Sequence, residues 1–204
     1  MSILLVRHGE TPANAARVVQ LPDAPLSLRG LAQAERLAER LALLGVGAIV
    51  TSDYARAHGT AERVQAATHA PLELWPELRE RHFGELRGRS YAEIGVDIFA
   101  PDYAPPGGET WAEFHERVAR AWEKVRSYAA RLDGNLAVIS HGLVCRSVIE
   151  RLIARPAGLA VPEAWANTSL TVIATRAPHE IELLNCSAHL AGLDASNAAL
   201  SAPV

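Results

Sequence analysis

Short apolar runs alternate with longer amphipathic segments along this chain. The runs have the length of buried strands, and they occupy residues 3–6, 47–52, 71–75 and 135–140. The intervening segments place apolar residues three and four positions apart, as amphipathic helices do, at residues 28–45, 54–67, 109–132 and 141–154. Two further apolar runs, expected to form a closing strand pair, follow at residues 169–175 and 179–185. This alternation predicts an α/β fold with a doubly wound, mainly parallel sheet flanked by helices.

The ends of the predicted helices carry residues that favour helix boundaries. Ser27 precedes the first long helix as a good N-cap, and Gly45 follows it, where glycine suits the backbone of a helix end. We expect Asp53 to cap the next helix and the longest helix to begin near Glu109. From Trp111 onward, the apolar residues of that helix predict a stripe that is buried in the core.

The size of the chain suits one domain. It has 204 residues, of which 49% are hydrophobic, and it shows no internal repeat. A chain of this length can bury a sizeable core, and we place the single domain at residues 1–187. The remaining residues, 188–204, are rich in Ala and Ser. We expect them to form a tail that is either disordered or a short helix.

Charge and cysteine content argue against several classes of protein. The formal net charge is −3, with both signs interspersed, which argues against binding to nucleic acid or to an anionic membrane. No apolar run is long enough to span a bilayer, and the first one stops at Arg7 without the basic region of a secretory leader. Cys145 and Cys186 match no disulfide or zinc-binding pattern, so we expect reduced thiols in a cytoplasmic protein.

Charged and titratable side chains stand where three of the predicted strands end. They are Arg7-His8-Gly9, His141-Gly142 and Arg56. In doubly wound sheets, ligands bind outside the carboxyl ends of the strands, so we expect these residues to converge on one pocket. The glycine beside each histidine permits close approach of the backbone to a ligand.

These residue types suit chemistry on a phosphate group. Arginine gives forked, permanently charged contacts to phosphate oxygens. A neutral histidine can attack phosphorus through one ring nitrogen while a hydrogen bond holds the other. The leaving oxygen then needs a proton from a carboxylic acid, and the candidates in the polar segment after the third strand are Glu77, Glu80 and Glu85.

Several segments together resemble the motifs of the histidine phosphatase superfamily, the phosphoglycerate mutase-like proteins. They are LLVRHGET from residue 4, TSDYARAHGTAE from residue 51, LRERHFGELRG from residue 78, PPGGET from residue 105 and VISHG from residue 138. The resemblance extends over about residues 2–184 and keeps the order of the motifs. It implies the phosphoglycerate mutase-like fold and an enzyme that transfers phosphoryl groups.

The resemblance also implies catalytic roles. His8 matches the nucleophile that takes up the phosphoryl group. Arg7, Arg56 and His141 match the residues that bind the phosphate oxygens and stabilise their charge in the transition state. Glu80 matches the proton donor to the leaving group, which afterwards can help to activate water.

Further matches concern the substrate and metal ions. Asn14 and Gly142 match positions at the phosphate pocket, and we expect both to bind substrate. Positive charge comes from the protein, so the resemblance implies neither a metal ion nor a cofactor. His82 adjoins Glu80 in the sequence and could line the pocket. The other histidines are expected to be surface or packing residues, and they are His58, His69, His115, His179 and His189.

Two branches of the family compete, a mutase primed by bisphosphoglycerate and a phosphatase in which water accepts the phosphoryl group. The mutases that this chain resembles carry a longer insertion after Gly88, with paired arginines for the far anionic end of the substrate. Here residues 89–106 are short and hold Arg89 as their only cation. The sequence therefore favours a phosphatase of small phosphorylated metabolites, with a mutase as the alternative and a non-catalytic phospho-ligand-binding protein behind both.

Substrate identity depends on the rim of the pocket. Tyr91, Phe99 and Tyr103 could cover it and contact the leaving group, or they could anchor their loop to the core. Leu143 follows His141-Gly142 at a position where relatives frequently carry a small residue, so it is expected to reshape the rim. The expected partner is a small phosphomonoester. The oligomeric state stays open, with a homodimer as one option.

Overall fold

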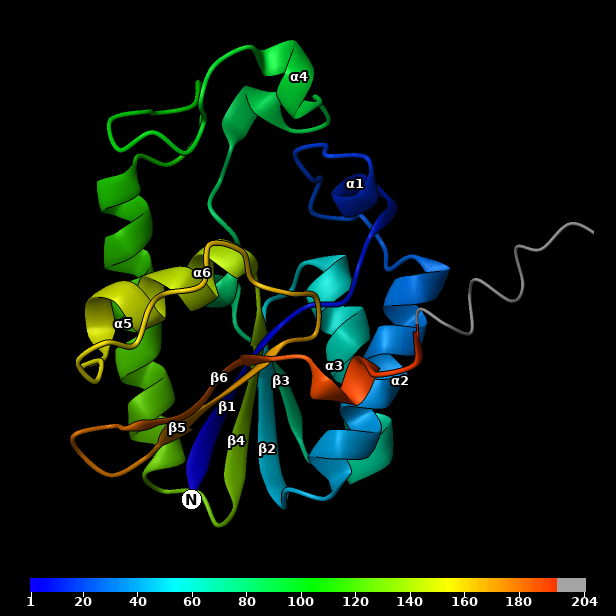
Figure 1. The fold of residues 1–204 in the computed structure, drawn as a ribbon, viewed down its shortest axis with the longest axis vertical. Coiled ribbons are helices and arrows are strands. Elements are labelled where there is room, and N and C mark those ends of the chain that lie inside the picture. Colours follow the sequence, from blue (N-terminus) through cyan, green and yellow to red (C-terminus); the bar gives the residue numbers. More distant parts are fainter. Residues whose placement is uncertain (194–204) are drawn as a thin grey trace, which may run out of the picture.

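The computed structural model describes residues 1–193 and is built around one six-stranded sheet (Figure 1). The strand order is β3-β2-β4-β1-β5-β6. The strands are β1 (Ser2–Arg7), β2 (Val46–Thr51), β3 (Leu72–Leu74), β4 (Asn135–Ser140), β5 (Leu170–Ala174) and β6 (Ile181–Cys186). The pairs β1–β4, β2–β4 and β2–β3 are parallel, whereas β5 and β6 run antiparallel to their neighbours. The predicted mainly parallel sheet is therefore confirmed.

Helices cover both faces of this sheet, as predicted. The α-helices are α1 (Pro12–Ala15), α2 (Leu28–Ala42), α3 (Ala55–Thr68), α4 (Tyr91–Ile94), α5 (Trp111–Ala129) and α6 (Gly142–Ser147). A π-helical turn (Val148–Leu152) continues α6, and short 3-10 helices occupy Pro76–Leu78, Gly84–Leu86 and Ala188–Leu190. Helices α2 and α3 pack on one face, and α5 and α6 on the other (Figure 1). Within residues 1–193, no helix combines the length and apolar character needed to cross a membrane.

Side-chain caps explain where the long helices begin. The hydroxyl of Ser27 accepts a hydrogen bond from the Gly30 amide at 2.9 Å, which confirms the predicted cap of α2. Helix α5 begins at Trp111, slightly later than predicted. Thr110 and Glu113 form a reciprocal capping box there and satisfy amides that the first helical turn leaves free.

The prediction that Asp53 caps α3 is wrong. Tyr54 holds the N-cap position of that helix and makes no side-chain cap. The Asp53 carboxylate instead accepts a hydrogen bond from Arg79 Nε at 2.7 Å. This ion pair lowers the pKa of Asp53 and ties the end of β2 to the polar segment after β3.

Only part of the predicted tail lies within the described residues. Residues 188–190 form the last 3-10 helix, and the ring of His189 contacts Arg40 of α2 at 3.2 Å. Residues 194–204 lie outside the described chain. The first part of the tail is thus a short helix held against α2.

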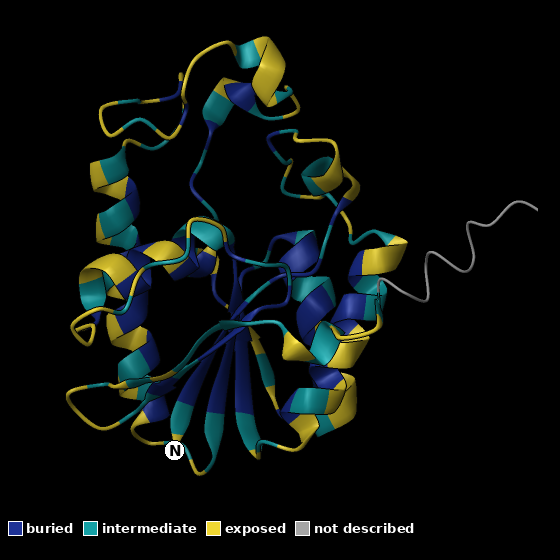
Figure 2. Ribbon diagram, in the orientation of Figure 1, coloured by how far each residue is buried: buried dark blue, intermediate teal, exposed yellow. Residues whose placement is uncertain are grey.

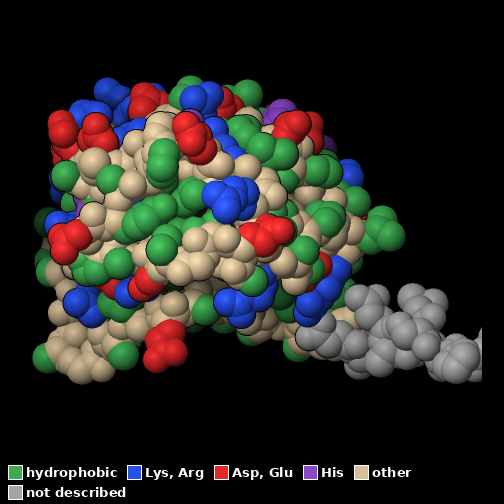
Figure 3. Space-filling model, turned by 90° about the horizontal axis from the view of Figure 1, so that it is seen from above, with side chains coloured by type: hydrophobic (Ala, Val, Ile, Leu, Met, Phe, Trp, Pro, Cys, Tyr) green, Lys and Arg blue, Asp and Glu red, His purple; other side chains and the backbone are tan. Residues whose placement is uncertain are grey.

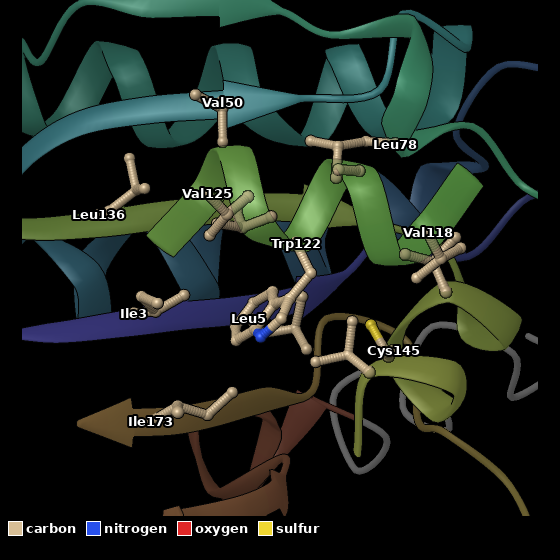
Figure 4. Close-up of a cluster of buried hydrophobic side chains, with 14 of the residues drawn as sticks. Ile3, Leu5, Val50, Leu78, Val118, Trp122, Val125, Leu136, Cys145 and Ile173 are labelled. Atoms are coloured by element: carbon tan, nitrogen blue, oxygen red, sulfur yellow. The ribbon is translucent and has the colours of Figure 1, made fainter. Parts of the chain in front are cut away.

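The sheet separates two apolar cores. Because side chains alternate along a strand, Ile3 and Leu5 of β1 enter the core under α5 and α6, whereas Leu4 and Val6 enter the core under α2 and α3. Figure 4 shows Trp122 of α5 in the first of these cores, together with Ile3 and Leu5. The middle of the sheet is buried, and the outer sides of the helices are exposed (Figure 2). This buried framework holds the carboxyl ends of β1, β2 and β4 in fixed positions.

Glycine is required where the segment carrying the predicted acid passes the loop before α5. Gly84 has φ of +53°, and a Cβ atom there would lie 1.9 Å from the Pro106 carbonyl oxygen. We expect Gly84→Ala to lower the free energy of unfolding by about 3 kcal/mol, measured by urea denaturation. Gly88 has φ of +83° but no atom within 4 Å of such a Cβ. Gly88→Ala should therefore lower the free energy of unfolding by only about 1 kcal/mol. Equal losses of stability in the two variants would contradict the clash at Gly84.

Candidate active site

The carboxyl ends of β1, β2 and β4 meet at the upper edge of the sheet in Figure 1, below α1 and α4. A cavity of about 300 Å³ opens there. Six of the predicted site residues line it, and they are Arg7, His8, Asn14, Arg56, Glu80 and Gly142. His141 is fully buried beside them, with its ring centroid 5.1 Å from that of His8. The fold therefore brings together the residues that the strand ends and the family motifs indicated.

His8 is held in one tautomer. Its Nδ1 lies 2.6 Å from the Gly9 carbonyl oxygen, which can only accept, so Nδ1 carries the proton. Its Nε2 is then unprotonated, and its lone pair accepts a hydrogen bond from Arg56 Nε at 3.2 Å. The pKa of His8 is well below its usual value, first because the ring is buried and then because Arg56 and Arg7 are positive. His8 is thus a neutral imidazole with an available Nε2.

Two arginines supply positive charge beside this ring. Arg7 donates through Nη1 to the Trp165 carbonyl, and its buried Nε has no partner among the described residues. Arg56 donates to the Leu21 carbonyl at 3.0 Å. Burial lowers the pKa of Arg56 to about 10, so it remains charged at neutral pH. Both guanidinium groups can therefore contact an anion bound at His8.

His141 presents a donor in the opposite orientation. Its Nε2 lies 2.9 Å from the Ser52 hydroxyl, which accepts from the Tyr54 amide and keeps its own proton to donate. When the Ser52 hydroxyl donates to Nε2, Nδ1 of His141 carries the ring proton, and no described residue accepts it. Burial, followed by the charge of Arg56, lowers the pKa of His141 well below its usual value. The unpaired Nδ1–H suits an oxygen of a bound phosphate.

Glu80 is the one acid of the three candidates that lines the cavity. Its carboxylate accepts hydrogen bonds from the amides of Arg81 at 3.1 Å and Leu143 at 3.2 Å. Burial raises the pKa of Glu80 and outweighs those bonds and the charges of the nearby arginines. Glu77 instead pairs with Lys124 at 3.4 Å, and Glu85 is exposed. A raised pKa favours the protonated form that a general acid needs.

Arg81 is a buried residue that connects the acid to the loop above the cavity. Its guanidinium donates to three backbone carbonyls, at Glu109 (3.1 Å), Ile98 (3.2 Å) and Tyr103 (2.6 Å). It also lies 3.9 Å from the centroid of the Trp111 ring. Arg81 is only 1% exposed, so these contacts fix the loop next to Glu80.

The aromatic residues of this loop divide between the two roles considered from sequence. Tyr91 and Phe99 line the cavity, with ring centroids 5.9 Å apart. Tyr103 does not line it and packs against a small apolar cluster with Phe83 and Leu86. Phe99 is thus placed to contact a ligand, whereas Tyr103 anchors the loop.

Sequence reasoning missed several residues of the cavity wall. These include Tyr54, Arg87, Arg146, Glu163 and Trp165. Tyr54 could have been found, because it lies three residues after the end of β2. Arg87 lines the cavity and donates to the Tyr54 hydroxyl at 2.5 Å. Arg89, which the sequence indicated as the only cation of its segment, does not line the cavity. His82 does not line it either, but its ring contacts Arg87 at 3.0 Å.

The surface around the cavity carries both charges. Figure 3 shows this end of the molecule, with basic and acidic side chains scattered among apolar ones.

In residues 1–193, no three His, Cys, Asp or Glu side chains are grouped so that they could hold a metal ion. Both cysteines are free, with Cys145 buried and Cys186 partly exposed. Arginine side chains bring positive charge to the cavity wall, and they are Arg7, Arg56, Arg81, Arg87 and Arg146.

Comparison with known proteins agrees with this geometry. The family model of the histidine phosphatase superfamily (branch 1) matches residues 3–187. The chain belongs to this superfamily. It is 35% identical over 190 residues to phosphoglycerate mutase-like protein 4 of Arabidopsis thaliana, covering 83% of this chain and 77% of that protein.

Two further proteins that are similar to this chain are named as phosphatases. The chain is 32% identical over 173 residues to the adenosylcobalamin/alpha-ribazole phosphatase of Salmonella typhimurium, covering 77% of this chain and 82% of the relative. The solved structure of the alpha-ribazole phosphatase from Shigella flexneri superposes with a TM-score of 0.80 at 27% identity. That alignment covers 92% of this chain and 98% of the other.

Proposed function

We propose that this chain hydrolyses phosphomonoesters of small metabolites through a phosphohistidine on His8, without a metal ion or cofactor. The observation that carries the proposal is the tautomer of His8, whose Nε2 is unprotonated and accepts a hydrogen bond from Arg56 in a cavity that also holds Arg7 and Glu80. Phosphatases among the relatives support it.

In the first step, the lone pair of His8 Nε2 attacks phosphorus and forms a P–N bond. The bond between phosphorus and the ester oxygen breaks, and protonated Glu80 gives its proton to that oxygen, so the leaving group departs as an alcohol. Arg7, Arg56 and the Nδ1–H of His141 hold the phosphoryl oxygens and stabilise their negative charge.

In the second step, water attacks the phosphohistidine. The Glu80 carboxylate takes a proton from the water, which returns the acid to its starting form. The P–N bond breaks, its electrons return to Nε2 as a lone pair, and inorganic phosphate leaves. Two backbone amides hold the Glu80 carboxylate in the same place for both steps.

Metal independence and cellular location belong to the proposal as well. Arginine side chains provide the positive charge that a metal ion would otherwise supply, so activity should persist in excess EDTA. A loss that Mg²⁺ or Zn²⁺ restores would contradict this. We place the enzyme in the cytoplasm, which its two free thiols support.

A phosphoglycerate mutase is the second candidate, and one observation favours it. Arg87 and Arg146 line the cavity in addition to the two arginines near His8. Sequence alone indicated Arg89 as the only cation for a second anionic group, so the structure weakens that argument against the mutase. A mutase would return the phosphoryl group to a bound intermediate instead of to water.

One assay separates the two candidates. The protein is incubated with p-nitrophenyl phosphate, a panel of phosphomonoesters and 3-phosphoglycerate, and released phosphate is followed. The 3-phosphoglycerate sample is also assayed for 2-phosphoglycerate, with and without bisphosphoglycerate. We expect phosphate release. Isomerisation that depends on bisphosphoglycerate, with little free phosphate, would instead establish the mutase.

Phe99 and Tyr103 should respond differently to truncation. Phe99→Ala removes a wall of the cavity, so we expect kcat/KM to change at least fivefold more for aromatic than for small aliphatic esters. Tyr103→Ala removes an anchor of the loop, so kcat/KM should fall by a similar factor for all substrates, and the protein should be less stable. Equal losses on all esters in Phe99→Ala would contradict substrate contact.

A further inference from the structure

A second hollow, with a volume of about 450 Å³, adjoins the catalytic cavity. Phe99, Leu143 and Arg146 line both of them, so the two are neighbours across these shared side chains. The rest of its lining is Pro101, Trp111, Ala112, His115, Ser147, Glu150 and Arg151. We call this hollow the α5–α6 groove. None of the catalytic roles above uses it.

The groove follows one side of a helix away from His8. Leu143, Arg146, Ser147, Glu150 and Arg151 are three, one, three and one positions apart, so they form a single stripe along α6 and its π-helical continuation. The stripe begins at Leu143, whose amide donates to the Glu80 carboxylate. At about 1.5 Å per residue, it extends about 12 Å from there to Arg151.

The walls of the groove have a definite chemistry. Phe99, Pro101, Trp111 and Leu143 give apolar surface, and the Trp111 ring is held in place by a hydrogen bond from Nε1 to the Ala100 carbonyl at 2.8 Å. A flat apolar group can lie against such surfaces. The beginning of the groove is thus suited to an aromatic ring.

The far end of the groove is basic. Arg146 pairs with Glu150 at 2.7 Å. Arg151 is exposed and makes no hydrogen bond or ion pair with any residue of the described chain. Its guanidinium is therefore available to an anionic group that reaches the end of the stripe.

We propose that the α5–α6 groove is a leaving-group subsite that selects elongated phosphomonoesters, whose flat aromatic part lies against Phe99 and Leu143 and whose distal anionic group pairs with Arg151. This inference rests on the proposed hydrolysis at His8 and names the class of substrate. The subsite explains why a bulky leucine stands at position 143, since its side chain forms the boundary that cavity and groove share.

The test uses three esters with leaving groups of similar acidity, which are phenyl phosphate, biphenyl-4-yl phosphate and 4′-carboxybiphenyl-4-yl phosphate. We expect kcat/KM for the carboxylated biphenyl ester to exceed that for phenyl phosphate at least tenfold. Ala112→Trp fills the groove from the exposed first turn of α5 and should bring that ratio to within twofold of one. Ala66→Trp, on the exposed side of α3, is the matched control and should keep the ratio.

Arg151 is tested separately. Arg151→Gln should remove the advantage of the carboxylated over the uncharged biphenyl ester, whereas the charge-matched control Arg63→Gln should keep it. The subsite would be overturned if the unmodified protein had similar kcat/KM values for the carboxylated biphenyl ester and phenyl phosphate, or if Ala112→Trp left their ratio unchanged. In either case, hydrolysis of phenyl phosphate would still uphold the proposed function. Absence of turnover on all three esters would overturn both.

Discussion

Replacing His8 by alanine is expected to lower kcat for phosphomonoester hydrolysis by about 10⁴-fold or more, because it removes the atom that forms the P–N bond. The loss should be of this size on every substrate, since both chemical steps pass through Nε2. Released phosphate measures the effect. A rapid quench with labelled substrate should also show phosphate bound to the unmodified protein, in a linkage that acid cleaves and alkali does not.

Binding distinguishes this result from misfolding. His8→Ala should still bind inorganic phosphate, because Arg7 keeps its position on β1, Arg56 on α3 and His141 directly after β4. His58→Ala is the matched control, since His58 lies on the same α3 helix as Arg56 and its Nε2 lies 4.0 Å from the Glu62 carboxylate. Turnover that survives in His8→Ala would remove the phosphohistidine from the mechanism.

Glu80→Gln should lower kcat/KM by about 10³-fold on alkyl phosphates and much less on p-nitrophenyl phosphate, whose leaving group needs little protonation. The pH profile gives a second readout. Attack needs neutral His8, so activity is lost as pH falls through the lowered pKa of that ring. Proton donation needs protonated Glu80, so activity is lost as pH rises through the raised pKa of that carboxyl. We therefore expect a bell-shaped profile of activity between the pKa of His8 and the pKa of Glu80.

The variant should lose the alkaline limb of this bell and keep the acidic one. Glu77→Gln is the matched control, because Glu77 lies in the same segment but pairs with Lys124 outside the catalytic cavity. Equal losses on both kinds of leaving group, together with an unchanged alkaline limb, would assign the proton to a group other than Glu80.

The strand ends could be predicted from sequence because they follow from simple periodicity. Four apolar runs alternating with amphipathic segments indicate a parallel sheet, and in such a sheet residues that follow β1, β2 and β4 must share one edge. That logic placed Arg7, His8, Arg56 and His141 together. Selecting Glu80 over Glu77 and Glu85 needed the family motif, since the three lie within one polar segment.

The cavity wall could not be predicted in the same way. Asp53 has a side chain that caps helices well, but its ion pair with Arg79 outweighs this local preference. Phe99 and Tyr103 share a loop and have similar chemistry, and only the packing of Tyr103 against Phe83 and Leu86 separates their roles. The orientation of a loop side chain depends on contacts far away in the sequence, which no local pattern encodes.

The way in which Arg81 holds the loop has a consequence for evolution within this fold. Among the described residues, its guanidinium donates hydrogen bonds to backbone carbonyls alone, at Ile98, Tyr103 and Glu109. Every amino acid offers such a carbonyl, so exposed side chains between Ile98 and Tyr103, such as Phe99, can be exchanged while the backbone stays attached beside Glu80. Substrate preference can therefore diverge by single substitutions while the chemical step is preserved, which makes residues 99–102 a suitable region for directed evolution of new specificities.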